Sequence, residues 1–332
     1  MQFLYDLVLK KYRLIAVFLL LIVGFFVMQI PNFQLDASSD SLVLEGDENL
    51  RYYQSIKQNY GSDDYLVISY QVENNLLDAA QLTHLSGLKK DLQAITQVRS
   101  VTSILDVPLF RSPPLSLIEL AGKSISIDKG NAELKLAAQE FKTSPLYANN
   151  LVSPDGKTTA VLVTLKSNQQ FQQRRSERNK MRFQRANNQL SEEQIKRLKV
   201  LENQVLKDAT LQSKIQAETI AQIRSTIDKY RDKASLFLGG VPMITTDIIS
   251  YINSDLIVFS LAVIGLMTLI LALIFKGIRW VLMPIGISIS AALMMTGILA
   301  FLGWKVTVIS SNFFSLLLVM TLSVTIHGAP AT

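Results

Sequence analysis

The chain has 332 residues, of which 49% are hydrophobic and only 18% charged, with a net charge of +6, no cysteine and two histidines. An average soluble domain is about one quarter charged, so this composition disfavours a simple soluble globule. Without cysteine there is no disulfide framework, thiol nucleophile or cysteine-based metal site. His84 and His327 lie far apart in the sequence, so we expect neither a histidine-rich metal centre nor a cofactor.

The first apolar run covers residues 14–30 and is ended by Pro31. A helix needs about 20 apolar residues to cross the hydrocarbon core of a bilayer. The run could be a cleaved signal peptide or an uncleaved transmembrane helix. It is longer than a signal-peptide h-region, and no small-x-small cleavage site follows it, so we predict a transmembrane helix that stays in place.

Residues 31–250 are long enough for a folded domain with its own core. Apolar alternation predicts strands, and apolar residues at spacings of 3 and 4 predict helices. The predicted strands are 64–72, 98–105, 158–166 and 235–238, and the predicted helices are 78–95 and 132–141. The domain thus begins as a βαβ unit, which indicates an α+β fold.

A polar helical insert, residues 169–233, separates the last two predicted strands. Asn187 and Asn188 interrupt it, and Ser191 with Gln194 forms the capping-box pattern of a second helix. Apolar residues follow at spacings of 3 and 4 along that helix: Ile195, Leu198, Leu201 and Val205, then Ile220, Ile223, Ile227 and Tyr230. We predict an antiparallel helical hairpin whose apolar stripe packs on its neighbour.

The first helix of this insert carries a basic patch, which with the single acid Glu177 gives a surplus of five of the chain's net six positive charges. The basic patch consists of Arg174, Arg175, Arg178, Lys180, Arg182 and Arg185. An alternative role for the insert is therefore a docking arm whose patch meets anionic headgroups or an acidic protein. Because the surplus is local, we expect no nucleic-acid partner.

The segment Leu238-Gly239-Gly240-Val241-Pro242 joins this domain to the next apolar run. The two glycines permit backbone angles closed to other residues, and proline cannot continue a strand ladder. We expect the chain to turn here, with Thr245, Thr246 or Asp247 capping a helix that leads into the second span.

Three further spans are predicted at residues 256–275, 281–302 and 306–326. Basic residues at Lys10, Lys11 and Arg13, and again at Lys276 and Arg279, favour a cytoplasmic location for residues 1–13 and for the link between the second and third spans. Residues 31–250 then lie on the outer side of the membrane. Trp280 and Trp304 are separated by about 36 Å of helix, which fits the two interfaces of one span.

Polar residues inside these spans are the candidate site residues, because each needs a partner in the membrane. Ser311, Ser315, Ser323 and His327 follow one i, i+4 line that is interrupted by Val319. Asn312 adjoins this line, and Asp255 lies at the outer edge of the second span. We interpret the line as either helix–helix contact or a proton or substrate path, facing protein or water. Small residues four apart in the third span, Gly286 with Ser290 and Ala292 with Thr296 and Ala300, indicate close helix packing.

No nucleophile–base set, phosphate-binding loop or metal-ligand spacing is visible in the sequence. Asp63-Asp64 and His84 are interpreted as ordinary surface residues. We therefore do not expect an enzyme.

One span, a large outer domain and closely spaced further spans resemble the N-terminal half of a resistance-nodulation-division (RND) superfamily exporter of the MMPL or hydrophobe/amphiphile type. The resemblance rests on Leu238–Pro242, Asp255-Leu256, Pro284, Gly303–Asn312 and Leu322–His327. It implies a porter-like outer domain, a membrane bundle similar to sterol-sensing domains, and proton-driven export of hydrophobic or amphiphilic, lipid-like molecules.

Two departures accompany the resemblance. Many members carry an acid for proton coupling in the fourth span, where this chain has Ser323. A full member also has two similar halves of six spans, so we expect this chain to be a truncated first half that is not transport-competent alone.

The implied location is a bacterial inner membrane, with residues 31–250 in the periplasm. The implied partners are the lipid bilayer, a lipid-like substrate, and the second half or an oligomer partner. From another class of function, the chain could be a membrane-anchored periplasmic scaffold or sensor that binds a partner through its helical arm.

Overall fold

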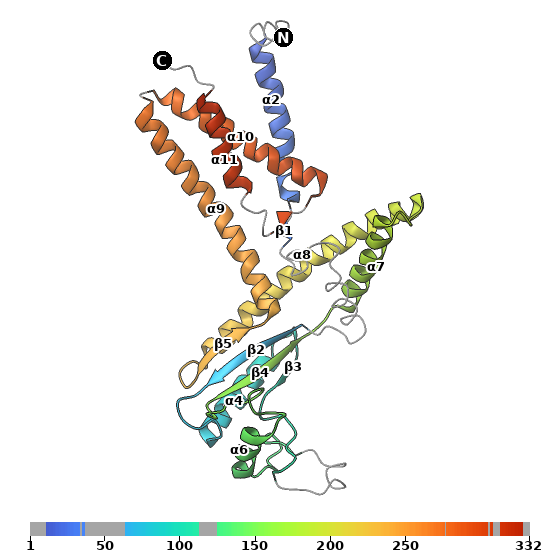
Figure 1. Ribbon diagram of the computed structural model, residues 1–332, viewed down its shortest axis with the longest axis vertical. Coiled ribbons are helices and arrows are strands. Elements are labelled where there is room, and N and C mark those ends of the chain that lie inside the picture. The colour runs from blue at the N-terminus through green and yellow to red at the C-terminus, as the bar shows by residue number, and fades with distance from the viewer. Residues whose placement is uncertain are drawn as a thin grey trace. The chain divides into compact units, whose positions relative to one another are not determined.

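The computed structural model describes residues 11–33, 35–36, 64–112, 125–275, 277–304, 306–307 and 313–327 (Figure 1). The chain divides into two compact units, which we call the sheet unit, Ser55–Thr246, and the membrane unit, Met1–Gln54 with Asp247–Thr332.

The sheet unit contains four strands and four helices among its described residues. In chain order these are β2 (Tyr65–Gln71), α4 (Ala79–Gln93), β3 (Val98–Thr102), α6 (Leu134–Thr143), β4 (Thr158–Leu165), α7 (Gln169–Ala186), α8 (Glu192–Asp228) and β5 (Ser235–Gly239). All four predicted strands and both predicted helices of the domain are confirmed, with small shifts of their ends.

The four strands form one sheet in the order β3-β4-β2-β5, and every neighbouring pair is antiparallel. The predicted βαβ unit is therefore split: β2 and β3 run parallel to each other, but β4 lies between them. With α8 leading from β4 into β5, the order is that of a ferredoxin-like βαββαβ fold.

The core of the sheet unit lies on the face of the sheet that α4 and α8 cover. Alternate residues of β2, among them Leu66, Ile68 and Tyr70, are fully buried there. Leu85 of α4 and Ile223 of α8 belong to the same core. Every second side chain of the strand thus packs against side chains that recur at 3.6-residue spacing on the two helices.

The predicted helical hairpin is confirmed in its first half only. Asn188 has a positive φ of 55° at the turn, and both capping-box bonds between Ser191 and Gln194 are present. Leu198, Leu201 and Val205 pack with Met181 of α7. The second half of the stripe, from Ile220 onward, packs instead into the core of the sheet unit. The reason is length: α8 has 37 residues and α7 only 18, so α7 cannot accompany α8 to its end.

The junction after β5 differs from our prediction. Helix α9 (Val241–Ile274) begins at Val241, so Thr245, Thr246 and Asp247 lie inside it and do not cap it. Proline is tolerated in the first turn of a helix, which explains the position of Pro242. Gly240 makes the sharp change of direction: its φ is +132°, and a Cβ there would lie 2.9 Å from the Tyr65 carbonyl oxygen.

The membrane unit is mainly helical. It contains α2 (Tyr12–Val27), the short 3₁₀ helix η1 (Ile30–Asn32), most of α9, α10 (Ile278–Leu302) and α11 (Phe313–His327), with the two-residue strands β1 (Leu35–Asp36) and β6 (Val306–Thr307). Among the described residues, three helical stretches are long and apolar enough to cross a membrane: Arg13–Asn32, Val241–Ile274 and Ile278–Leu302.

Only part of the predicted fourth span, residues 306–326, lies within the described residues. Val306 and Thr307 pair in parallel with Leu35 and Asp36 as β6 and β1, a pairing that was not predicted, and α11 covers Phe313–His327. The fourth span as a whole stays a prediction. β-branched residues such as Val306, Thr307 and Val308 favour strand over helix. The prediction weighed only the apolar character of these residues and so did not use this preference.

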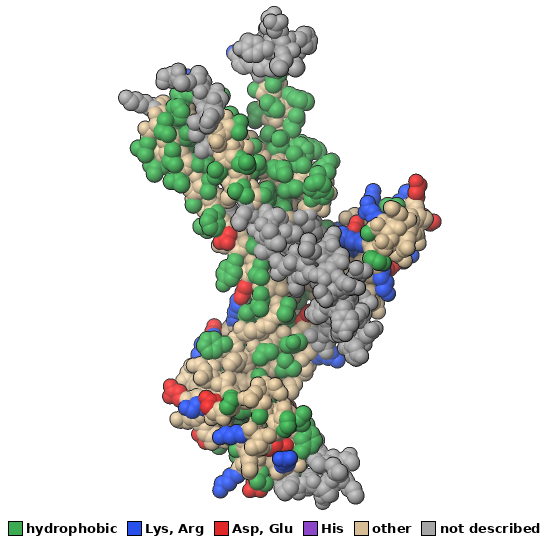
Figure 2. Space-filling model, viewed as in Figure 1, with side chains coloured by type: hydrophobic (Ala, Val, Ile, Leu, Met, Phe, Trp, Pro, Cys, Tyr) green, Lys and Arg blue, Asp and Glu red, His purple; other side chains and the backbone are tan. Residues whose placement is uncertain are grey.

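Helix α10 packs against both α2 and α11 (Figure 1). It ends at Gly303, whose φ of 66° allows the Trp304 amide to donate back to the Leu299 carbonyl. Figure 2 shows hydrophobic side chains over most of the visible surface of the membrane unit. Phe18, Leu21 and Leu273, for instance, are more than half exposed, as is expected for side chains that face lipid.

Candidate functional sites

The polar line predicted in the fourth span is only partly described. Ser311 and Asn312 lie outside the described residues, and His327 ends α11. Ser315 is half-buried in the first turn of α11, whereas Ser323 is exposed one turn beyond the exposed Val319. Helix α11 buries Leu318 instead. The role of this line in a proton or substrate path stays a prediction.

Asp255 is exposed on α9. Among the described residues, no hydrogen bond or ion pair joins it to another candidate residue, and its role also stays a prediction.

One of the two groups of small residues in α10 is buried within the membrane unit. Ala292, Thr296 and Ala300 are buried, as their spacing predicted, and the Thr296 hydroxyl donates to the Ala292 carbonyl of the same helix at 2.9 Å. Gly286 is exposed, and a Cβ there would meet no atom within 4 Å. The packing prediction is therefore confirmed for the group of three and not for Gly286.

The basic patch lies along α7, and part of it is paired with acids of α8. Arg174 binds Asp208 at 2.7 Å and Arg182 binds Glu202 at 2.7 Å. A third bridge joins Glu177 to Arg197 at 2.6 Å. These ion pairs join the two helices, a relationship that spacing along one helix could not reveal. Lys180 and Arg185 are exposed on the same helix.

A polar cluster links three elements of the sheet unit around His84 of α4. Its Nδ1 lies 2.8 Å from the hydroxyl of Tyr70 on β2, and its Nε2 lies 3.4 Å from Asp232 before β5. The Tyr230 ring packs against the imidazole, and its hydroxyl donates to Asp91 at 2.9 Å. Burial, together with the negative charge of Asp232, raises the pKa of Tyr70 to about 12.

This cluster was missed in the sequence, where His84 read as an ordinary surface residue. Its side chain is only 9% exposed. The polar partners come from positions 14 and 148 residues away in the chain, so no local spacing could indicate them. The signal that was available is the position of Tyr70 on the buried face of a strand, since a buried tyrosine hydroxyl needs a hydrogen-bond partner.

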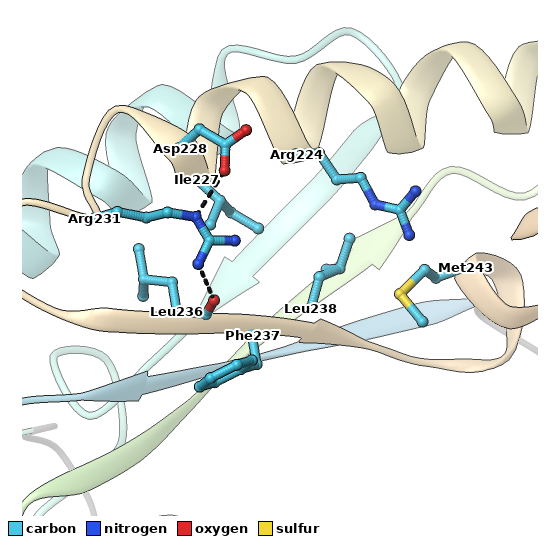
Figure 3. Close-up of a pocket in the computed structure, with 8 residues that line it drawn as sticks. All are labelled: Arg224, Ile227, Asp228, Arg231, Leu236, Phe237, Leu238 and Met243. Atoms are coloured by element: carbon cyan, nitrogen blue, oxygen red, sulfur yellow. Dashed lines mark hydrogen bonds and ion pairs between the residues drawn. The ribbon is translucent and has the colours of Figure 1, made fainter.

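A hollow of about 250 Å³ lies where the end of α8, the strand β5 and the first turn of α9 meet. It is lined by Arg224, Ile227, Asp228, Arg231, Leu236, Phe237, Leu238 and Met243. Figure 3 shows the two arginine side chains on the side of β5 where Leu236 and Leu238 point, with Phe237 on the other side of the strand. The Arg231 guanidinium is held in place, because it donates to Asp228 and to the Leu236 carbonyl, each at 2.7 Å.

Next to the hollow, α8 is hydrogen-bonded to the first turn of α9. The Gln216 side-chain amide donates to the Pro242 carbonyl at 2.7 Å and to the Thr246 hydroxyl at 3.1 Å. Met243 lies between these two partners in the sequence and lines the hollow. Among the described residues, no group of three or more His, Asp or Glu side chains is arranged as a metal site.

These features define a membrane protein with at least three apolar helices long enough to span a bilayer and a separate α+β unit. Residues 199–327 match the MMPL family. This segment is an MMPL family domain, part of the RND superfamily, so the predicted resemblance is confirmed. No curated protein matches the chain.

The matched segment runs from α8 through β5, α9 and α10 to the last residue of α11. It therefore joins the end of the sheet unit to three helices of the membrane unit. The family implies an RND-type membrane transporter, with contacts to the membrane and to a substrate. MMPL transporters are generally not enzymes.

Proposed function

We propose that this chain serves in proton-driven export of hydrophobic or amphiphilic, lipid-like molecules across a bacterial inner membrane. The observation that carries the proposal is the continuous family match over residues 199–327. It includes the end of a polar domain and the apolar helices that follow, which is the arrangement an exporter needs to pass a substrate between membrane and water. In this proposal residues 31–250 lie in the periplasm and residues 1–13 in the cytoplasm.

The RND resemblance implies two similar halves in one transporter. We therefore expect residues 1–332 to require a second half for a full transport cycle. Ser323 cannot carry a proton charge as an acid does, so a coupling residue is expected in the second half.

Reconstitution in proteoliposomes tests this proposal. The chain is incorporated alone, or together with the second half of a complete MMPL exporter, and the movement of a fluorescent lipid is followed with and without an imposed proton gradient. We expect gradient-dependent movement only with both halves. Movement by the chain alone would contradict the need for a second half, and no movement with both would contradict the transport proposal.

A second candidate function is a scaffold or sensor that binds an acidic partner through the hairpin of α7 and α8. It is supported by the hairpin's own small core and interhelical ion pairs, which give the arm a defined shape. Reversing Lys180 and Arg185 to Glu leaves those ion pairs in place. Loss of a copurifying partner from this double variant would favour the scaffold, and an unchanged set of partners would remove it.

A further inference from the structure

The hollow between α8, β5 and α9 has a net positive lining. Two arginines, Arg224 and Arg231, and one acid, Asp228, give a surplus of one positive charge. A guanidinium has five N–H donors. The hydrogen bonds of Arg231 to Asp228 and to the Leu236 carbonyl use two of these. The group is thus fixed in position while N–H donors are left for an anion.

The other walls of the hollow are apolar. Leu238 of β5 and Met243 of α9 are half-buried and pack on the core of the sheet unit. In Figure 3 the Arg224 side chain extends toward the side of the hollow where these two residues lie. A cationic group beside a half-buried apolar wall suits a ligand with one anionic end and a hydrocarbon chain.

We propose that this hollow binds a short-chain anionic amphiphile, with its carboxylate or phosphate monoester at the guanidinium groups of Arg224 and Arg231 and its alkyl chain on Leu238 and Met243. A guanidinium group can donate two parallel hydrogen bonds to a carboxylate or to a phosphate, so the same two arginines could bind either head group.

The hollow, of about 250 Å³, is small, so a short alkyl chain suits it. Hexanoate, a six-carbon carboxylate, is a suitable probe. A ligand this small is expected to bind with a Kd of about 1 mM.

The site involves the first turn of α9. Since Gln216 already joins α8 to this turn, a ligand between Arg224 and Met243 adds a second link between the same two elements. The inference concerns binding by the sheet unit and does not depend on transport. Its failure would leave the proposed function untouched.

Methyl NMR of the full chain in lipid nanodiscs tests the inference. The chain has nine methionines, and Met243→Leu assigns the signal of Met243. Hexanoate, hexyl phosphate, 1-hexanol, hexylammonium and acetate are titrated separately. We expect a saturable shift of the Met243 methyl signal with hexanoate, hexyl phosphate or both, and the stronger of the two identifies the preferred head. Hexanol and acetate should bind at least about tenfold more weakly, and hexylammonium should not bind.

Arg224→Gln should weaken binding of the preferred anion at least about fivefold, because a charge-assisted hydrogen bond is lost. Arg224→Lys, which keeps the charge, should weaken it less. Arg197→Gln, on the same helix but outside the hollow, is the matched control and should leave the Kd unchanged. Binding of hexanol as tight as that of hexanoate, an unaltered Kd in Arg224→Gln, or no saturable shift with either anion would each overturn the proposal.

Discussion

Gly297 of α10 lies directly against the backbone of Phe26 on α2. A Cβ built at Gly297 would overlap the Phe26 carbonyl oxygen and would lie 2.6 Å from its carbonyl carbon. No side chain fits in this space, so the two helices can approach this closely only at a glycine. Small residues commonly allow such approaches in membrane proteins.

Replacing Gly297 should therefore loosen the contact of α2 with α10. We expect Gly297→Ala to destabilise the membrane unit by about 1–3 kcal/mol, the usual cost of forcing a methyl group into a packed contact. Thermal unfolding of the full chain in detergent measures this as a lower Tm. Gly286→Ala on the same helix is the control, since a Cβ there meets nothing within 4 Å. Equal Tm values for the two variants would refute the close contact.

Leu198 lies in a small core between α7 and α8 that is separate from the core of the sheet unit. Leu198→Ala should destabilise this hairpin by about 2–5 kcal/mol, because a fully buried leucine leaves a cavity. Hydrogen exchange should speed up in α7 and the first half of α8 but not in β2 or β4. Val200→Ala, at a position 57% exposed on the same helix, should change little. Faster exchange throughout the sheet would show instead that hairpin and sheet unfold as one.

Lys89 is a buried lysine of α4 that binds two carboxylates, Asp106 at 2.5 Å and Asp128 at 2.8 Å. Lys89→Met should cost the sheet unit about 1–3 kcal/mol, since both acids lose their cation while remaining partly exposed to water. Hydrogen exchange of β3 measures the loss. The exposed neighbour Lys90→Met is the control. A stability of Lys89→Met equal to that of the control would mean that these ion pairs contribute nothing.

The pH dependence of this contribution follows from the pKa of Lys89. Burial acts to lower that pKa, but the hydrogen bonds and charges of Asp106 and Asp128 outweigh it, so the pKa is raised above 10.5. A raised lysine pKa gives stability that is complete below about pH 10.5 and is lost as the pH rises through the higher folded value. The difference between wild type and Lys89→Met should therefore be constant from about pH 7 to pH 9. A decline within that range would contradict the raised pKa.

Local patterns in the sequence predicted most elements of the fold. Strand alternation, leucine spacing and the Ser191 capping box each act within a few residues, and each is confirmed. The order of the strands depends on contacts between distant residues, which is why the position of β4 between β2 and β3 was not predicted. The pairing of Val306 in β6 was not predicted for a related reason, because its partner Leu35 lies far away in the chain.

The candidate sites were less predictable than the fold. The basic residues of α7 were found from composition, but their partners Asp208 and Glu202 lie on another helix. The hollow lined by Arg224 was not predicted. Its lining residues come from α8, the turn after it, the edge strand β5 and α9, and none of these segments carries a sequence motif that indicates a binding site.

The central claim of the proposed function is that α9 crosses the bilayer and that residues 31–250 lie on its outer side. Because the chain has no cysteine, a single introduced cysteine reports its own location. Ser235→Cys lies in the sheet unit, and Lys276→Cys follows the apolar end of α9. We predict that a membrane-impermeant maleimide labels Ser235→Cys in intact spheroplasts and Lys276→Cys only after the membrane is opened. Labelling of Lys276→Cys in intact spheroplasts, or protection of Ser235→Cys there, would contradict the account.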